Sequence, residues 1–229
     1  MFSGTDGDAA VASDPMRISG AVLVGAILCG LTAGCTSASP SRHPHAASTS
    51  RSSSAVALSP TTSPTPGLPS VPADVPTTGS NVRPGEKPPA MPLEATHHTA
   101  AGAKAFAMFF VRVIDWGGAT VSSNYMRHYT FQGCSTCAPG LSGVDRDRVA
   151  GRRYVGGRFT VQSAHLYSKP LETKADYTAL VVFDISAFKE FSKTGRLIES
   201  EPRQVDEQFE VSLRWETGSW QTIDLRLSR

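Results

Sequence analysis

The sequence predicts an α+β domain in which two to three N-terminal helices pack on a curved, cone-like antiparallel sheet of about four strands. Two observations support this fold class. Apolar residues recur with a helical period as far as about residue 154, and with a period of two after Gly156-Gly157. Helices followed by an antiparallel sheet are typical of α+β domains. We expect one globular domain at residues 93–229, preceded by segments of a different kind.

Residues 1–34 have the features of a signal peptide. Met16-Arg17 precede an apolar stretch from Ile18 to Leu31, which at about 14 residues is shorter than the roughly 20 that cross a bilayer. Residues 1–15 contain three Asp and no Lys or Arg, although a signal peptide begins with a positive region. We therefore expect translation to start at Met16. An uncleaved membrane anchor is the alternative interpretation.

The stretch Leu31-Thr32-Ala33-Gly34-Cys35 matches a lipobox, the cleavage and acylation signal of a bacterial lipoprotein. The small side chains before Cys35 suit the signal peptidase, since bulky ones would block its active site. Diacylglycerol and palmitate chains on Cys35 would bury many methylene groups, and two chains give stable anchoring. The sequence thus predicts a lipoprotein held at the outer face of the cell membrane through Cys35.

Residues 35–92 have the composition of a disordered tether that follows the lipidated cysteine. Twelve of the sixteen prolines lie in this segment, and Ser and Thr fill much of the remainder. Such a segment buries too little apolar surface to offset its ordering entropy, and proline favours an extended chain. It fits either a passive spacer or a stalk that carries the domain through a thick wall.

The helical part of the domain is predicted in three pieces. The first helix, capped by Thr96 or Thr99 and ended by Gly117-Gly118, has six apolar residues at helical spacing: Ala103, Phe106, Ala107, Phe110, Val113 and Ile114. A second, shorter helix is expected over residues 121–129 and a third over residues 142–154. Alternating apolar and polar residues then predict strands, which are expected at residues 159–167, 177–186, 208–216 and 220–227.

Two cysteines remain in the mature domain, because Cys29 leaves with the signal peptide and Cys35 carries lipid. We expect Cys134 and Cys137 to form a disulfide on the oxidising side of the membrane. A redox site is the alternative, but Pro139-Gly140 argues against a helix beginning at Cys134 that would lower its thiol pKa. A zinc site would need two more ligands, which the neighbouring sequence lacks, so no metal or cofactor is predicted.

Two groups of residues are candidates for a functional site. The first could line a pocket inside the cone: Trp116, Tyr125, His128, Tyr129, His165 and Asp184. Asp115 and the other tryptophans are further interior candidates. The second is a positive run that could meet anionic lipid or wall polymer, and its members are Arg146, Arg148, Arg152 and Arg153, with Arg158 close by. A solvated helix face balanced by neighbouring aspartates is the alternative for this run.

These residues carry a resemblance to a known family. The lipobox, the Pro/Thr tract, residues 88–92, the run Thr99-x-x-Gly102-Ala103-Lys104-Ala105-Phe106, Cys134-x-x-Cys137 and Gly156-Gly157 resemble an actinobacterial lipoprotein family of unknown function. The element order is similar to the cystatin-like and nuclear-transport-factor-2-like cone folds. The resemblance implies a fold and a location but no catalytic residues. The charged segment 187–206 departs from other members and leaves the strand boundaries there open.

Composition and motifs together favour a cell-surface lipoprotein that binds or assembles and is not an enzyme. The formal net charge of +2 argues against nucleic acid as a partner. The expected partners are the membrane, through Cys35, and an envelope protein or a cell-wall polymer. A pocket-based enzyme of the cyclase or isomerase kind is one alternative, and a thiol–disulfide protein is the other.

Overall fold

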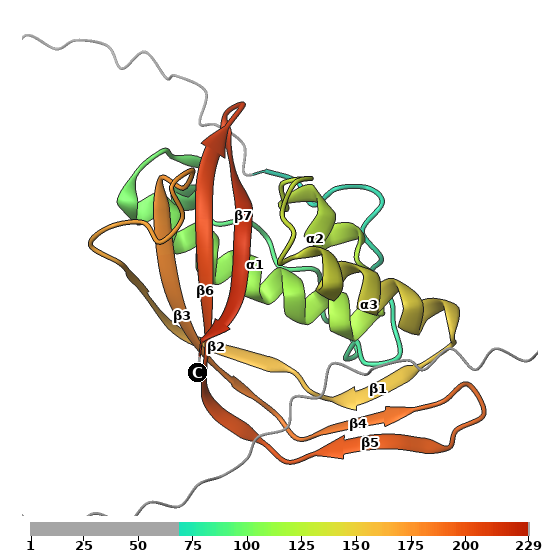
Figure 1. Ribbon diagram of the computed structural model, residues 1–229. Helices are drawn as coiled ribbons and strands as arrows, with labels where there is room; N and C mark the ends of the chain where they lie inside the picture. Colours follow the sequence, from blue (N-terminus) through green and yellow to red (C-terminus); the bar gives the residue numbers. More distant parts are fainter. Residues whose placement is uncertain (1–68, 229) are drawn as a thin grey trace, which may run out of the picture. The chain divides into compact units, whose positions relative to one another are not determined.

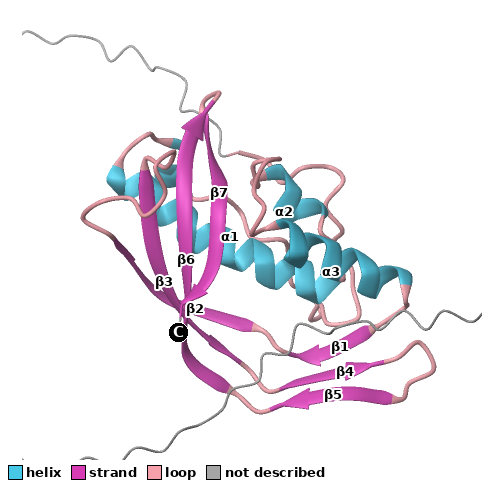
Figure 2. Cartoon of the chain, in the orientation of Figure 1, coloured by secondary structure: helices cyan, strands magenta, loops and turns pink. Residues whose placement is uncertain are grey.

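The computed structural model describes residues 69–228. A short 3-10 helix, η1 (Leu93–Thr96), precedes the helices α1 (Ala100–Thr120), α2 (Asn124–His128) and α3 (Ala138–Val149). Seven strands follow: β1 (Arg153–Gly156), β2 (Phe159–Leu166), β3 (Tyr177–Ile185), β4 (Phe188–Phe191), β5 (Leu197–Glu201), β6 (Gln204–Glu216) and β7 (Ser219–Ser228). Three helices packed against antiparallel sheets confirm the α+β class (Figures 1 and 2).

Helix α1 begins at the predicted cap and ends beyond the predicted stop. The Thr99 hydroxyl accepts a hydrogen bond from the backbone N–H of Gly102 at 3.0 Å. The helix continues through Gly117-Gly118 to Thr120, and Val121 ends it with a positive φ of 50°. Gly117 serves packing instead, because a Cβ there would lie 2.7 Å from the end of the Met126 side chain on α2.

The strands form two sheets with matching order. The larger sheet has the order β2-β3-β6-β7 and the smaller, hereafter the small sheet, has the order β1-β4-β5. Only a few residues separate β1 from β2, β3 from β4 and β5 from β6. In chain order β1 is thus followed by β2, β3 by β4 and β5 by β6 after short breaks. The chain changes direction at these three breaks, where the larger sheet meets the small sheet (Figure 1).

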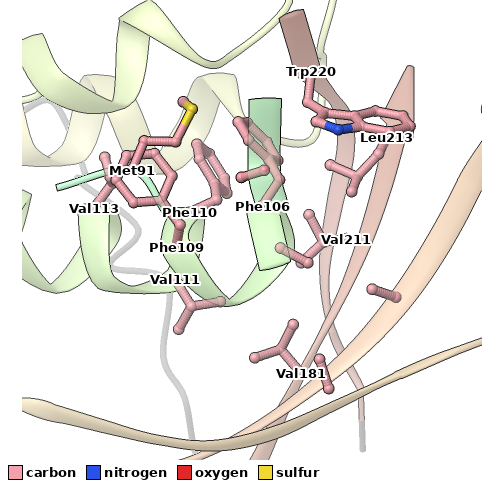
Figure 3. Packing of buried hydrophobic residues seen from close by; sticks show 14 of the residues in the cluster. Met91, Phe106, Phe109, Phe110, Val111, Val113, Val181, Val211, Leu213 and Trp220 are labelled. Atoms are coloured by element: carbon pink, nitrogen blue, oxygen red, sulfur yellow. The ribbon is translucent and has the colours of Figure 1, made fainter. Parts of the chain in front are cut away.

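The hydrophobic core lies between α1 and the larger sheet, and aromatic side chains fill it (Figure 3). Phe106, Phe109 and Phe110 project from α1 and are all at most 1 % exposed. They belong to one buried cluster with branched and aromatic side chains of the sheet: Val181, Phe183, Val211, Leu213 and Trp220. Phe106 and Phe109 also pack against the Tyr129 ring, which follows α2. Each such side chain contributes about 1.5–3 kcal/mol on burial, which makes this layer the main source of stability.

None of the helices in residues 69–228 is long and apolar enough to cross a membrane.

The packed part of the chain starts before the predicted boundary at Leu93. Residues 71–92, hereafter the N-terminal arm, bury Val75 and Met91 against the core. The indole N–H of Trp116 donates to the carbonyl of Pro76 at 2.9 Å, and the Tyr125 hydroxyl donates to the carbonyl of Pro89 at 2.5 Å. The prolines therefore mark an extended arm along the domain here, which corrects the tether boundary for these residues.

Other differences from the sequence prediction concern residues 138–206. Helix α3 begins at Ala138 rather than at residue 142, with Pro139 in its first turn, where a missing N–H costs no helical hydrogen bond. It ends at Val149, and Tyr154 belongs to β1 instead. Strands β1, β4 and β5 were not predicted. The strands predicted at residues 159–167, 177–186, 208–216 and 220–227 are confirmed as β2, β3, β6 and β7.

Candidate functional site

The predicted pocket residues of the helical half have structural partners. Tyr125 and Tyr129 pack edge-on against Phe109, with ring centroids 6.1 and 5.2 Å away. Burial raises the pKa of both hydroxyls, so neither is poised to lose a proton near neutral pH. Trp116 is buried and bonded to the arm, as described above. His128 lies at the surface, 2.7 Å from the Asp74 carboxylate of the arm.

The two predicted pocket residues of the sheet lie on its other side. Ala164 and Val181 face α1 and pair with each other, so their strand neighbours His165 and Leu180 face away from it. Asp184 lies on that same outer face, opposite Thr160. Its carboxylate accepts hydrogen bonds from Arg203 at 2.6 Å, from Gln162 at 2.6 Å and from the Asp206 backbone, and the Arg203 bond lowers its pKa. The six pocket candidates therefore do not converge on one site.

A charge cluster occupies the bend between the sheets, and sequence reasoning found only part of it. Arg158, which is 7 % exposed, donates to both oxygens of Asp115 at 3.0 and 2.8 Å and to both oxygens of Glu86 at 2.9 and 2.6 Å. A fifth bond reaches the Asn81 carbonyl at 3.1 Å. The Arg158 hydrogen bonds lower the Glu86 pKa from 4.5 to about 2 and raise the Arg158 pKa.

Arg158 thus belongs to a buried cluster rather than to the exposed positive run. The cluster joins α1, through Asp115, to the N-terminal arm, through Glu86. The arm also meets the edge strand β1, because the Asn81 side chain donates to the Gly156 carbonyl and accepts from its N–H, at 2.6 and 3.2 Å. No sequence pattern predicted this, since the partners of Arg158 are 43 and 72 residues away.

The predicted disulfide between Cys134 and Cys137 is present, and both residues are only 4 % exposed. Its loop is fixed to the edge strand β7. The Thr136 hydroxyl donates to Asp224 at 2.8 Å and accepts from the Leu225 N–H at 3.0 Å. Cys137 is the residue directly before α3. The bridge therefore closes the turn between α2 and α3 against the sheet.

The positive run is divided among different surroundings. Arg152 pairs with Glu190 and lies 3.3 Å from Asp147, so its charge is balanced. Arg148 lies 4.0 Å from Asp145 on α3. Arg146 and Arg153 are exposed, with no ion pair to any of residues 69–228. The four arginines therefore do not form one surface. Arg146 lines a hollow of about 410 Å³ with Arg127, Ser142, Asp145, Val149 and Ala150.

His98 lies in an aromatic cluster that the sequence did not indicate. Its ring stacks on Trp215 with centroids 5.2 Å apart, and its Nε2 is 3.3 Å from the Asp176 carboxylate. The neighbouring Trp220 donates its indole N–H to the His97 carbonyl at 3.1 Å. These contacts join the start of α1 to the β6–β7 hairpin.

Within residues 69–228 no group of three His, Cys, Asp or Glu side chains is arranged to hold a metal ion.

Comparisons with known proteins identify a family. The family described as "Family of unknown function (DUF6318)" matches residues 71–226. A search of curated proteins found no match. Among solved structures, the "Crystal structure of intermembrane space region of chloroplast protein ARC6" covers 57% of this chain and 97% of that chain, at 9% identity and a TM-score of 0.37. A TM-score this low does not establish a shared fold, so the expected similarity to cone-shaped folds stays a prediction.

Proposed function

Since the chain belongs to the family of unknown function DUF6318, we propose its role from its geometry: a lipid-anchored, non-enzymatic binding domain at the outer face of the cell membrane. One observation carries the non-enzymatic part of this proposal. The interior around α1, where the sequence left a pocket possible, is filled by a buried cluster that joins Phe106, Phe109 and Phe110 to side chains of the larger sheet (Figure 3). A ligand pocket needs converging polar groups around open volume, and a packed aromatic layer offers neither.

The anchoring part rests on the sequence. Cys35 and residues 1–34 lie outside the described residues, and the lipobox pattern is the support for acylation. The arm revises the length of the proposed tether. If it runs from residue 36 to residue 70, an extended proline-rich chain of that length reaches on the order of 100 Å. The domain could then act some distance from the bilayer or fold back onto it.

The alternatives have less support from the described residues. The pocket candidates of the enzyme alternative include His128 and Asp184, yet His128 pairs with Asp74 at the surface and Asp184 lies on the outer sheet face. A thiol–disulfide protein needs an accessible attacking sulfur. Cys134 and Cys137 are both buried, and their loop is bonded to β7.

The first experiment is intact-mass measurement of the protein purified with detergent from membranes, under native conditions. We expect the mass of residues 35–229 plus the acyl groups on Cys35, with no bound small molecule. The variant Cys35→Ser should lack the acyl mass, whereas the matched variant Ser37→Ala should keep it.

Each part of the proposal can fail separately. A parent protein whose mass includes residues 16–34, or whose mass lacks acyl groups, would contradict lipid anchoring. A stoichiometric small molecule that dissociates on unfolding would contradict the filled interior and favour the pocket enzyme instead.

A further inference from the structure

The small sheet has two faces of different character. Residues directly opposite each other in antiparallel strands project to the same side. The register Tyr154–Glu190–Glu199 and Gly156–Phe188–Glu201 therefore defines one face. This face contacts α3, since the Tyr154 hydroxyl donates to Asp147 and Glu190 is buried beside Arg152. The carboxylates of the three strands, Glu190, Glu199 and Glu201, all lie on this side, where Glu190 is buried and Glu199 is exposed on the edge strand β5.

The other face, hereafter the basic–apolar face, carries cations and apolar side chains. The register pairs Arg153 with Phe191 and Leu197, and Val155 with Lys189 and Ser200. Arg153 and Lys189 are exposed, and within residues 69–228 neither has an ion-pair partner. No acidic side chain belongs to this face. Two lone cations here attract anions without competition from a neighbouring carboxylate.

Apolar side chains on this face are unusually exposed. Val155 is 56 % exposed and Leu197 is 48 % exposed. Ile198, the extra residue where the β4–β5 register shifts, is 41 % exposed. The hairpin that joins β4 to β5 adds the exposed cations Lys193 and Arg196 at the end of the sheet. Branched aliphatic side chains thus alternate with cations across one continuous surface.

A shallow hollow lies beside the Arg153 guanidinium. Its volume is about 300 Å³, and its lining consists of Ser80, Arg153, Tyr154, Val155, Phe191 and Gly195. An added Cβ on Gly195 would lie 3.6 Å from the Arg153 Nη2, so the guanidinium reaches across the β4–β5 hairpin. A hollow with one free guanidinium and a hydroxyl side chain at its edge has room and donors for a phosphate group.

We propose that the basic–apolar face docks on the surface of a membrane that contains anionic lipid. Arg153 and Lys189 bind lipid phosphates, while Val155, Leu197 and Ile198 enter the interface between head groups and acyl chains. The combination of charges favours this occupant. A soluble polyanion would be attracted by the cations alone, whereas exposed aliphatic side chains gain free energy only where an apolar phase receives them.

This inference deepens the proposed function, because a domain tethered through Cys35 meets the membrane at high local concentration. A weak surface interaction then suffices to hold one orientation. The register places the basic–apolar face on the side of the small sheet opposite to Tyr154, which bonds to α3, so docking would leave the hollow on α2 and α3 free for a partner.

The test measures co-sedimentation of the chain from residue 35, with Cys35→Ser, on phosphatidylcholine vesicles and on vesicles of phosphatidylglycerol mixed equally with phosphatidylcholine. This chain retains the compact unit that contains residues 69–228 and lacks acyl chains. We expect binding to the anionic vesicles, decreasing with added salt because screening weakens charge attraction. Arg153→Gln with Lys189→Gln should lower the partition coefficient about 25-fold, since each cation near an anionic surface contributes about fivefold.

A matched control changes the same charge elsewhere. Lys104 and Arg112 are exposed on α1, so Lys104→Gln with Arg112→Gln removes two cations without touching the basic–apolar face. This variant should retain vesicle binding within about threefold. A third variant, Leu197→Ser, keeps the charges and should bind about tenfold less, since it removes an apolar side chain from the interface. Circular dichroism checks that each variant is folded.

Three results would overturn the proposal: no binding of the parent chain to anionic vesicles, equal loss in both double variants, or unchanged binding of Leu197→Ser. The last would show attraction by charge alone, which an anionic polymer or peptide would provide as well as a membrane. Because acylation is absent from the assay, these outcomes leave lipid anchoring untouched. A chain that fails here and yet carries acyl groups on Cys35 when purified from membranes would refute docking alone.

Discussion

Replacing Arg158 by Ala tests whether the charge cluster at the bend stabilises the fold. The substitution leaves the Asp115 and Glu86 carboxylates facing each other without their shared cation. It also removes the donor to the Asn81 carbonyl. Breaking a buried ion pair from one side costs about 3–5 kcal/mol, because the remaining charge stays desolvated. The Asp115 side chain is 13 % exposed and that of Glu86 is 25 % exposed, so both can regain some water. We expect a loss of about 3 kcal/mol at pH 7, at the lower end of that range.

The same cluster predicts how stability changes with pH. The Glu86 pKa is lowered from 4.5 to about 2, mainly by its hydrogen bond from Arg158. A depressed carboxyl pKa stabilises the folded state above pH 4.5, and this contribution disappears as the pH falls from 4.5 to about 2. The shift corresponds to about 3 kcal/mol, which partial exposure reduces to about 2 kcal/mol. This amount is part of the Arg158 effect, so Arg158→Ala should lose stability less steeply in acid than the parent chain.

The assay is equilibrium unfolding in urea at a series of pH values, followed by tryptophan fluorescence. Arg127→Ala is the matched control. It removes an arginine that is 53 % exposed and pairs with Asp145 on the surface, so it should cost at most about 1 kcal/mol. Loss of less than about 1 kcal/mol in Arg158→Ala, equal losses in both variants, or an unchanged acid slope would refute the reasoning about the buried cluster.

Three further variants test local features of the fold by the same unfolding measurement. Thr99→Ala removes the cap of α1 and should cost about 1 kcal/mol, whereas a loss near zero would show that the cap is dispensable. Cys134→Ser with Cys137→Ser opens a small loop and should cost about 2 kcal/mol, and the same drop should appear in the parent chain under reducing agent. Gly156→Ala should cost more than Gly85→Ala: both have positive φ, but an added Cβ at Gly156 would lie 1.9 Å from the Ala187 carbonyl oxygen and the one at Gly85 meets nothing within 4 Å. Equal losses would mean that the φ angle, and not the close approach, decides.

The helix and the long strands could be predicted because each repeats one period over many residues. The apolar face of α1 recurs over three turns or more, and β6 alternates along most of its length. Strands β1, β4 and β5 have four or five residues each, which is too short for a period to stand out. Glu190 is buried although it is charged, so the β4 pattern reads as a polar loop in sequence.

Composition alone places the N-terminal arm in the predicted tether, because it does not distinguish an extended chain that is packed from one that is free. Its prolines disfavour helix and sheet in both cases. The packing depends on carbonyl groups of Pro76 and Pro89 that accept bonds from distant aromatic side chains. Every residue has a backbone carbonyl, so the sequence does not reveal which carbonyls accept such bonds. Val75 and Met91 are the only strongly buried apolar residues of this arm, too few to form a pattern.

The charge cluster explains why a buried arginine occupies the bend rather than an apolar residue. An apolar side chain of similar size could match its burial, and buried ion pairs are weak evidence for added stability. Arg158 has a second task, however, because four segments meet around it. Its guanidinium binds the arm and α1, and its backbone N–H and carbonyl bond to Ser186 at the β3–β4 junction. No apolar residue could satisfy the Asp115 carboxylate and the Asn81 carbonyl together. The arm that continues from the proposed tether is thereby joined to the point where the small sheet diverges, so the direction of the basic–apolar face depends on the segment nearest the membrane anchor.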